Sequence, residues 1–217
     1  MNRRNTWLLA LVLISALAVR LAVAAASAHN PWVGDELSYH LVAWNLATGH
    51  GYGRYLGHHD AERGPSYIFL VAGIYRVFGQ GKMAPFIFQA FLDTLNCFLV
   101  FRICLLLFKR YDVAVTACLL YAGYPRLVIQ VGVLINEVLM NTAVLLGIYL
   151  FLASCLRAKR HGLVLSAAAL GIGALTKPIL ALFPFLFAWS VRVRGKTWSG
   201  LPGLAGQLAI IALVMSP

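Results

Sequence analysis

The chain has 217 residues, of which 61% are hydrophobic and 12% are charged, and its mean hydropathy is +0.80. A typical globular domain carries about a quarter charged residues, so this composition argues against a soluble protein and indicates a polytopic membrane protein. The net charge of +11 comes from short basic clusters between apolar runs. This pattern favours membrane topology over nucleic-acid binding.

The first apolar segment covers residues 7–26 and is about long enough to span a bilayer. The basic residues Arg3 and Arg4 before it and the small residues at its end also fit a cleavable signal peptide. Its length and the interruption by Arg20 favour a retained first helix. The four cysteines all lie inside apolar segments without metal-ligand spacing, so we interpret them as small hydrophobic residues.

Six further segments are predicted to span the membrane. They cover residues 83–108, 112–128, 136–156, 163–177, 178–192 and 200–217. The segments at 163–177 and 178–192 form one apolar run, which we divide at Lys177 and Pro178 because proline interrupts helical hydrogen bonding. The sequence therefore predicts an all-α membrane protein with about seven transmembrane helices.

Basic residues test the orientation of these spans. With a cytoplasmic N-terminus, ten of the eighteen basic residues fall in the cytoplasmic loops, as the positive-inside rule expects. Residues 28–82 then form an extracytoplasmic loop. Because a charge inside the bilayer needs a partner, Arg20 and Asp93, both in the outer halves of their spans, are predicted to pair.

The first loop is predicted to contain two amphipathic helices that lie along the membrane interface, over residues 36–48 and 67–78. Asp35 is placed to cap the first of them, and Gly49 to end it. Four of the seven acidic residues and five of the six histidines fall between residues 29 and 62. Ionisable groups near a low-dielectric medium have shifted proton affinities, which makes Asp35 and Glu36 candidates for chemistry at the membrane surface.

Several motifs occur in the order and spacing of a known superfamily. They are Gly34-Asp35-Glu36-Leu37-Ser38-Tyr39 with Ala43, Leu46 and Gly49; Glu62-Arg63-Gly64-Pro65-Ser66-Tyr67; Tyr124-Pro125; Asn136-Glu137; Leu175-Thr176-Lys177-Pro178; and Ser216-Pro217. Over nearly its whole length the chain resembles the C-type membrane glycosyltransferases, with the protein O-mannosyltransferase-like and aminoarabinose-transferase-like enzymes as the most similar groups.

The resemblance implies one module over residues 1–217, made of a first helix (1–27), an extracytoplasmic loop (28–82) and six further helices (83–217). It implies an inverting hexosyl- or pentosyltransferase of a bacterial inner membrane. The donor would be a sugar on a polyprenyl phosphate, and the acceptor an extracytoplasmic lipid, glycan or protein. Members usually continue beyond the final Ser-Pro, so we expect a truncated or minimal version. A transporter or flippase of a lipid-linked substrate and a non-catalytic subunit stay open as alternatives.

The resemblance also assigns roles to residues. Asp35 is the predicted general base, with Glu36 as a second catalytic residue that orients the acceptor or holds a cation. Substrate or phosphate contacts are predicted for Tyr39, Arg63, Tyr67, Glu137 and Lys177.

Structural roles are the alternatives for these residues. Asp35 and Glu36 would only stabilise the start of a helix. Arg63 would pair with Glu62 or Asp60 or contact lipid headgroups. Tyr39 would anchor at the interface, Lys177 would reach for the headgroups, and Glu137 would start a helix or pair with Arg126.

A metal site is the weakest of the candidates. His58, His59 and Asp60 are ligand types for a divalent cation, but their spacing matches no closed motif. A solvated polar loop is the more common arrangement for such residues. No cofactor is therefore predicted, and a divalent cation stays as an alternative.

Overall fold

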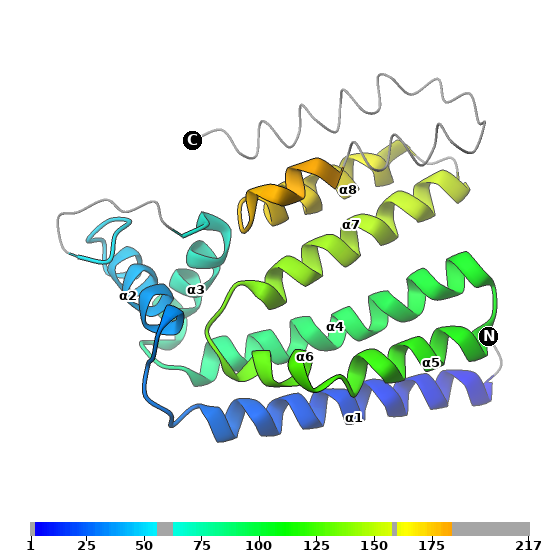
Figure 1. The fold of residues 1–217 in the computed structure, drawn as a ribbon, viewed down its shortest axis with the longest axis horizontal. Coiled ribbons are helices and arrows are strands. Elements are labelled where there is room, and N and C mark those ends of the chain that lie inside the picture. The colour runs from blue at the N-terminus through cyan, green and yellow to red at the C-terminus, as the bar shows by residue number, and fades with distance from the viewer. Residues whose placement is uncertain (1–2, 56–62, 158–159, 184–217) are drawn as a thin grey trace. The chain divides into compact units, whose positions relative to one another are not determined.

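The fold was obtained as a computed structural model, which describes residues 3–55, 63–157 and 160–183 (Figure 1). Every regular element in these ranges is a helix. Among the described residues, three helices are long and apolar enough to cross a membrane, or four if a bent pair forms one span. The predicted all-α membrane fold is therefore confirmed. Two compact units, Met1–Thr142 and Ala143–Pro217, divide the chain and are described separately.

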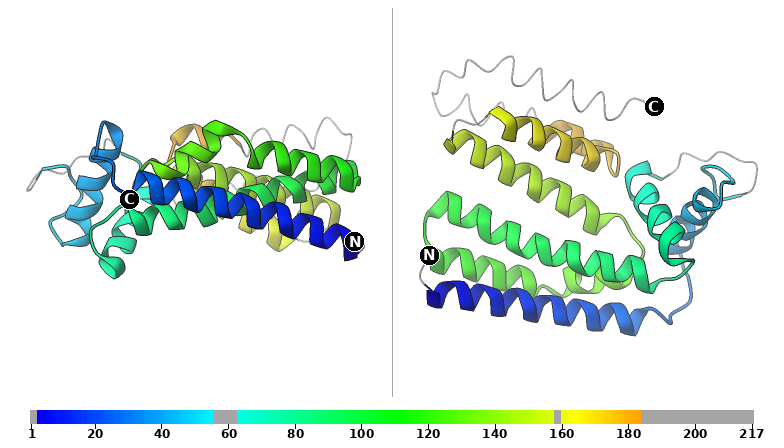
Figure 2. Two further views of the ribbon diagram at one scale, coloured as in Figure 1. Left: turned by 90° about the horizontal axis from the view of Figure 1, so that it is seen from below. Right: turned by 180° about the vertical axis from the view of Figure 1, so that it is seen from behind.

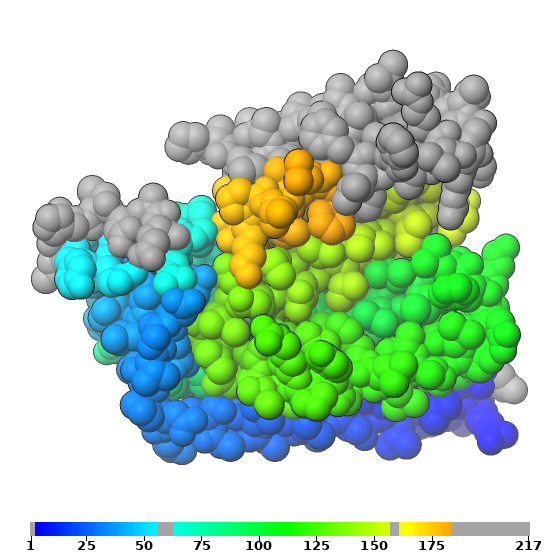
Figure 3. Space-filling view, viewed as in Figure 1, coloured from blue at the N-terminus to red at the C-terminus, as the bar shows by residue number. Residues whose placement is uncertain are grey.

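The first unit is built on three helices that lie side by side, α1 (Arg3–Ser27), α4 (Met83–Phe108) and α5 (Tyr111–Ala122) (Figures 1 and 2). A shared core includes Leu9, Val12, Ala16, Cys97, Phe101 and Cys118. On the face shown in Figure 3, the surfaces of α1 in blue and α5 in green adjoin each other. Large apolar side chains such as Trp7 and Leu120 are exposed on these helices, as lipid contact requires. The predicted spans at 7–26 and 83–108 are confirmed.

The third predicted span is broken. Helix α5 is followed by α6 (Pro125–Ile129) and the 3₁₀ helix η1 (Gln130–Gly132), with a bend of 55°. Pro125 stands at the first position of α6, where its missing N–H and fixed φ do no harm, while it could not continue α5. The segment then passes very close to α1, since a Cβ on Gly132 would lie 2.3 Å from the hydroxyl oxygen of Ser27.

Two shorter helices pack against each other at the end of the bundle where α1 ends and α4 begins (Figure 1). They are α2 (Asp35–Ala47) and α3 (Pro65–Phe78), close to the predicted helices at 36–48 and 67–78. Their shared core contains Tyr39, Val42, Tyr67, Val71 and Tyr75. Gly49, with φ of 83°, follows the end of α2 in a left-handed conformation that suits glycine.

The second unit contains most of α7 (Glu137–Arg157), then α8 (Arg160–Ala174) and the 3₁₀ helix η2 (Pro178–Leu182). Ser166 donates a 2.8 Å hydrogen bond to the carbonyl of Gly147, which holds α8 against α7. Helix α7 confirms the predicted span at 136–156, and the chain breaks between Ala174 and Pro178, close to the predicted position. Most of the predicted span 178–192 and all of 200–217 lie outside the described residues.

A buried ion pair joins α1 to α4, as predicted. Arg20 Nε lies 2.6 Å from Asp93 Oδ2, and both side chains are fully buried. The other carboxylate oxygen accepts hydrogen bonds from Tyr121 at 3.0 Å and Asn96 at 3.3 Å. Arg20 also donates to the carbonyl of Ala122 at 3.3 Å, next to the bend. These intramembrane charges therefore serve the packing of the bundle.

Candidate functional site

Helix α2 begins directly at Asp35. The N-cap position belongs to Gly34, whose φ of 56° turns the chain into the helix, and no side chain makes a capping hydrogen bond. The alternative that Asp35 caps α2 is therefore wrong. Instead its side chain is 68% exposed, near the positive end of the helix dipole, where a carboxylate is stabilised.

Arg63, two residues before α3 begins, reaches Asp35. Its Nη2 donates to Asp35 Oδ1 over 2.6 Å, and this hydrogen bond raises the pKa of Arg63. The guanidinium also lies 5.1 Å from the centre of the Tyr39 ring, and Tyr52 donates a 2.6 Å hydrogen bond to the carbonyl of Arg63. Asp35 was not among the partners that the sequence suggested for Arg63. Those partners, Glu62 and Asp60, lie outside the described residues.

Tyr39 and Tyr67 are both buried beneath this ion pair. Their rings meet edge to face with centres 5.2 Å apart. Burial raises the pKa of Tyr39, although the nearby Arg63 opposes the shift, so its hydroxyl stays protonated near neutral pH. The Tyr67 hydroxyl donates to Gln89 Oε1 over 2.6 Å. Tyr39 therefore faces the guanidinium, while the Tyr67 hydroxyl holds α3 to α4.

Glu36 has a different environment from its neighbour Asp35. It is buried, and its Oε2 accepts a 2.8 Å hydrogen bond from the ammonium of Lys82. Its Oε1 accepts a 3.1 Å hydrogen bond from the backbone N–H of Leu134. Adjacent carboxylates thus differ in exposure: Asp35 can meet a ligand, whereas Glu36 is enclosed by protein.

The two ion pairs at this site differ in strength because one is exposed and the other is buried. An exposed pair such as Asp35–Arg63 contributes about 0–1 kcal/mol to stability, so it can open readily. Breaking a buried pair such as Glu36–Lys82 by removing one partner costs about 3–5 kcal/mol, because the other charge is left without compensation in a low dielectric. The exposed pair is therefore adaptable and the buried pair is rigid.

Glu137 begins α7 at the same end of the bundle. Its charge contributes to the raised pKa of Tyr39. The segment before it is fixed by Gln89, whose Nε2 donates to the carbonyls of Val131 and Val133, each at 2.9 Å. Pairing of Glu137 with Arg126 stays a prediction.

The remaining predicted residues belong to other parts of the chain. Lys177 belongs to the second unit, where it precedes η2, and its role stays a prediction. His58, His59 and Asp60 lie outside the described residues. Within the part of the chain that the structure describes, no group of three or more histidine, cysteine or acidic side chains is arranged to hold a metal ion.

Sequence reasoning did not select Lys82 or Gln89. Lys82 looks like one more basic residue at the edge of a span, and Gln89 is a single polar residue inside an apolar helix. Polar groups in the membrane are costly unless paired, which is the one signal that could have drawn attention to Gln89.

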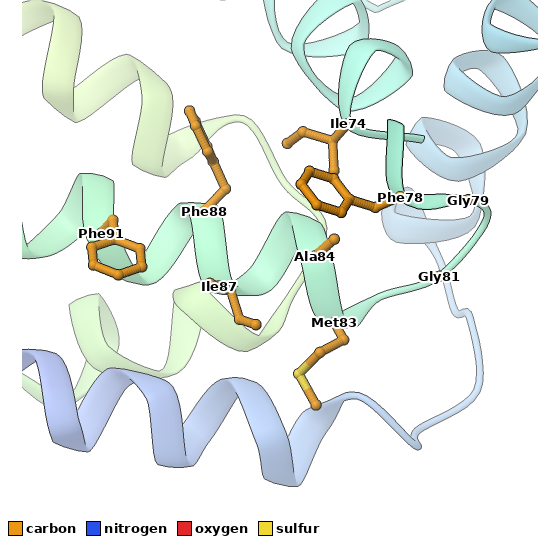
Figure 4. Close-up of a pocket in the computed structure, with 9 residues that line it drawn as sticks. All are labelled: Ile74, Phe78, Gly79, Gly81, Met83, Ala84, Ile87, Phe88 and Phe91. Atoms are coloured by element: carbon orange, nitrogen blue, oxygen red, sulfur yellow. The ribbon is translucent and has the colours of Figure 1, made fainter. Parts of the chain in front are cut away.

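An apolar pocket of about 470 Å³ lies beside this region, between the end of α3 and the start of α4 (Figure 4). It is lined by Ile74, Phe78, Gly79, Gly81, Met83, Ala84, Ile87, Phe88 and Phe91. The side chain of Phe78 is 73% exposed, so the pocket opens to the surroundings of the bundle. An apolar chain could occupy it.

The sequence of this chain is similar to that of a known protein family and of two named proteins. The family described as "Dolichyl-phosphate-mannose-protein mannosyltransferase" matches residues 62–217. Proteins from Pseudomonas paraeruginosa (strain DSM 24068 / PA7) and Pseudomonas aeruginosa (strain UCBPP-PA14), each named undecaprenyl phosphate-alpha-4-amino-4-deoxy-L-arabinose arabinosyl transferase, are 26% identical over 222 residues. These alignments cover 99% of this chain but 40% of the length of each relative. No solved structure gives a significant match.

Proposed function

Because the chain belongs to the dolichyl-phosphate-mannose-protein mannosyltransferase family, and so to the C-type glycosyltransferases that its motifs resemble, we propose that it transfers a sugar from a polyprenyl-phosphate carrier. The acceptor is a lipid, glycan or protein at the extracytoplasmic face of a bacterial inner membrane. The names of the Pseudomonas relatives make undecaprenyl-phosphate aminoarabinose the first donor to test, and the family description makes a mannosyl donor the second.

The observation that carries this proposal is the 2.6 Å contact between Asp35 and Arg63. A glycosyl transfer from a lipid phosphate needs a base for the acceptor hydroxyl and a cation for the departing phosphate. Asp35 is an exposed carboxylate, and Arg63 carries a planar fork of donors that fits phosphate oxygens. Both groups stand at the same end of the helix bundle.

In the proposed reaction the acceptor hydroxyl attacks the anomeric carbon of the donor sugar. Asp35 takes the hydroxyl proton as the new C–O bond forms, and the bond from the anomeric carbon to the phosphate oxygen breaks. The electron pair leaves with the polyprenyl phosphate, whose charge is stabilised by Arg63. Attack from the face opposite the leaving group inverts the anomeric configuration.

Tyr39 lies against Arg63, and Glu137 begins α7 at the same end of the bundle. Tyr39 supports the guanidinium through its ring at 5.1 Å, and its protonated hydroxyl can donate to a donor oxygen. Glu137 provides an acceptor for sugar hydroxyls. We further assign the apolar pocket between α3 and α4 to the first carbons of the polyprenyl tail, since the side chains that line it are apolar.

The test uses the full chain in proteoliposomes with undecaprenyl phosphate carrying a radiolabelled sugar, and bacterial envelope extract as acceptor. Transfer predicts label in the acceptor fraction together with release of undecaprenyl phosphate, with inversion seen by NMR of the product. Label that crosses the bilayer while still on its carrier would support the transporter or flippase instead. Absence of both donor binding and transfer would favour a non-catalytic subunit.

A further inference from the structure

Lys82 is a lysine enclosed by protein at the residue before α4. Its ammonium donates to Glu36 Oε2 at 2.8 Å and to the carbonyl of Pro31 at 3.0 Å. The same ammonium lies 4.2 Å from the centre of the Trp32 ring and 5.9 Å from that of Phe86. Two aromatic faces and two oxygens thus replace the water that a lysine normally keeps.

Glu36 connects this lysine to two other segments. It directly follows Asp35 in the first turn of α2, so its position determines where that turn lies. Its second oxygen holds the N–H of Leu134, three residues before Glu137. One buried carboxylate therefore joins the starts of α2 and α4 and the approach to α7.

Neither member of the pair can touch a substrate in this arrangement. Their side chains are 6% and 5% exposed, and both oxygens of Glu36 already accept hydrogen bonds from protein groups. Trp32 closes the site further, because its ring also stacks on that of His40 with centres 4.0 Å apart. A role in the reaction must therefore act through the residues that the pair holds in place.

We infer that Glu36 and Lys82 are positioning residues for the proposed sugar transfer, and that their ion pair fixes Asp35 and Glu137 relative to each other. This inference rests on the proposed function. It replaces the predicted acceptor contact of Glu36 by an indirect role, and it adds Lys82 to the residues on which turnover depends.

The experiment compares Glu36→Gln, Lys82→Met and the double variant in the sugar-transfer assay. Each single variant leaves one buried charge without its partner, so the start of α2 shifts. We expect kcat to fall about 10- to 100-fold with KM changed less than about threefold, because misplacement of a catalytic group affects the transition state most. The double variant leaves no uncompensated charge, and its kcat should return to within about threefold of wild type.

The matched control is the second buried ion pair, Arg20–Asp93, in the middle of the bundle. Asp93→Asn should lower the melting temperature as much as Glu36→Gln, yet leave the kcat of the folded protein unchanged. If the Glu36 and Lys82 variants behave like this control, the pair is structural only and the inference is wrong. A double variant as inactive as Glu36→Gln would also overturn it, because Glu36 would then act directly.

A failure of the proposed function has a different signature. Wild-type protein that neither binds undecaprenyl phosphate nor transfers sugar would overturn the transferase and the positioning role together. Wild-type activity alongside fully active single variants would overturn the positioning role alone.

Discussion

Arg63 holds Asp35 over 2.6 Å, although the Asp35 side chain is 68% exposed to solvent. In the proposed reaction these groups have separate tasks, one binding phosphate and the other accepting a proton. Without a donor, each satisfies the other. Since an exposed pair is weak, a phosphate can replace Asp35 at the guanidinium and release the carboxylate for the acceptor. Donor binding would thus prepare the base.

Asp35→Asn should abolish most of the transfer. A neutral amide cannot take the acceptor proton, and loss of a general base typically lowers kcat about 10²- to 10⁴-fold. Affinity for undecaprenyl phosphate should stay within a few-fold of wild type, because Arg63 is retained. The control is Asp112→Asn, since Asp112 is also exposed and paired with an arginine, Arg110. An Asp35→Asn variant with full activity would exclude Asp35 as the base.

Substitution of Arg63 should act first on donor binding. Arg63→Gln removes a charge-assisted hydrogen bond worth about 1.5–3 kcal/mol, which corresponds to a rise in Kd of roughly 10- to 150-fold for undecaprenyl phosphate. Arg63→Lys keeps the charge without the planar fork, so its Kd should lie between those of wild type and Arg63→Gln. Tryptophan fluorescence titration in detergent measures the Kd of both variants, with Arg110→Gln as control. Equal Kd values for Arg63→Gln and wild type would remove Arg63 from the phosphate site.

His40 predicts a loss of stability in mild acid. Its Nδ1 lies 3.0 Å from the Tyr75 hydroxyl, and burial together with the charge of Lys82 lowers the pKa of His40, opposed in part by Glu36. The unfolded chain therefore binds this proton more readily, so stability present above about pH 6.5 is lost as the pH falls through that value. Melting temperatures from pH 7.5 to 5 should decline less steeply in His40→Asn. The exposed His50→Asn is the control and should keep the wild-type slope.

The Arg20–Asp93 pair predicts recovery of stability by a double substitution. Asp93→Leu leaves a buried guanidinium without its carboxylate and should cost about 3–5 kcal/mol. Arg20→Met combined with Asp93→Leu removes both charges, and most of that loss should be regained. Equilibrium unfolding in mixed detergent micelles gives both values. Additive losses in the double variant would mean that the two side chains do not depend on each other.

Filling the apolar pocket should weaken the binding of polyprenyl carriers. Ala84 lines the pocket, and Ala84→Phe would occupy space that the proposal gives to the polyprenyl tail. We expect affinity for undecaprenyl phosphate to fall about tenfold, an estimate based on the loss of a few buried methylene groups. Affinity for geranyl phosphate should fall by a similar factor, because its chain supplies the same first carbons. Leu120→Phe, on the exposed face of α5, is the control for an added ring in contact with lipid.

The spans and the Arg20–Asp93 pair could be predicted from the sequence because the membrane imposes simple conditions. An apolar run long enough for the bilayer becomes a helix, and a charge inside it requires a partner at the same depth. The break of the third span at Pro125 could also be expected, but the 55° angle between α5 and the segment Pro125–Gly132 could not. This angle depends on how closely Gly132 approaches α1, which no local pattern reveals.

The candidate site could be predicted only in part. The motifs selected Asp35 and Arg63, but their contact joins residues 28 positions apart and exists because α2 packs on α3. The capping role expected for Asp35 failed because Gly34, with its left-handed φ, takes that position. The sequence also did not reveal that Asp35 is exposed while Glu36 is buried. Neighbouring helix residues point in directions about 100° apart, and only the surrounding fold decides which of them is buried.

The Arg20–Asp93 ion pair between α1 and α4 affects how the protein inserts into the membrane. Arg20 is synthesised 73 residues before Asp93, so α1 must insert while its charge has no counter-ion from the chain. An arginine in a spanning helix opposes insertion, by about 2.5–3.5 kcal/mol at the helix centre and by less toward the end of the helix, where Arg20 lies. Stable residence of α1 in the bilayer is thereby linked to the arrival of α4, and the two helices are expected to integrate as a unit.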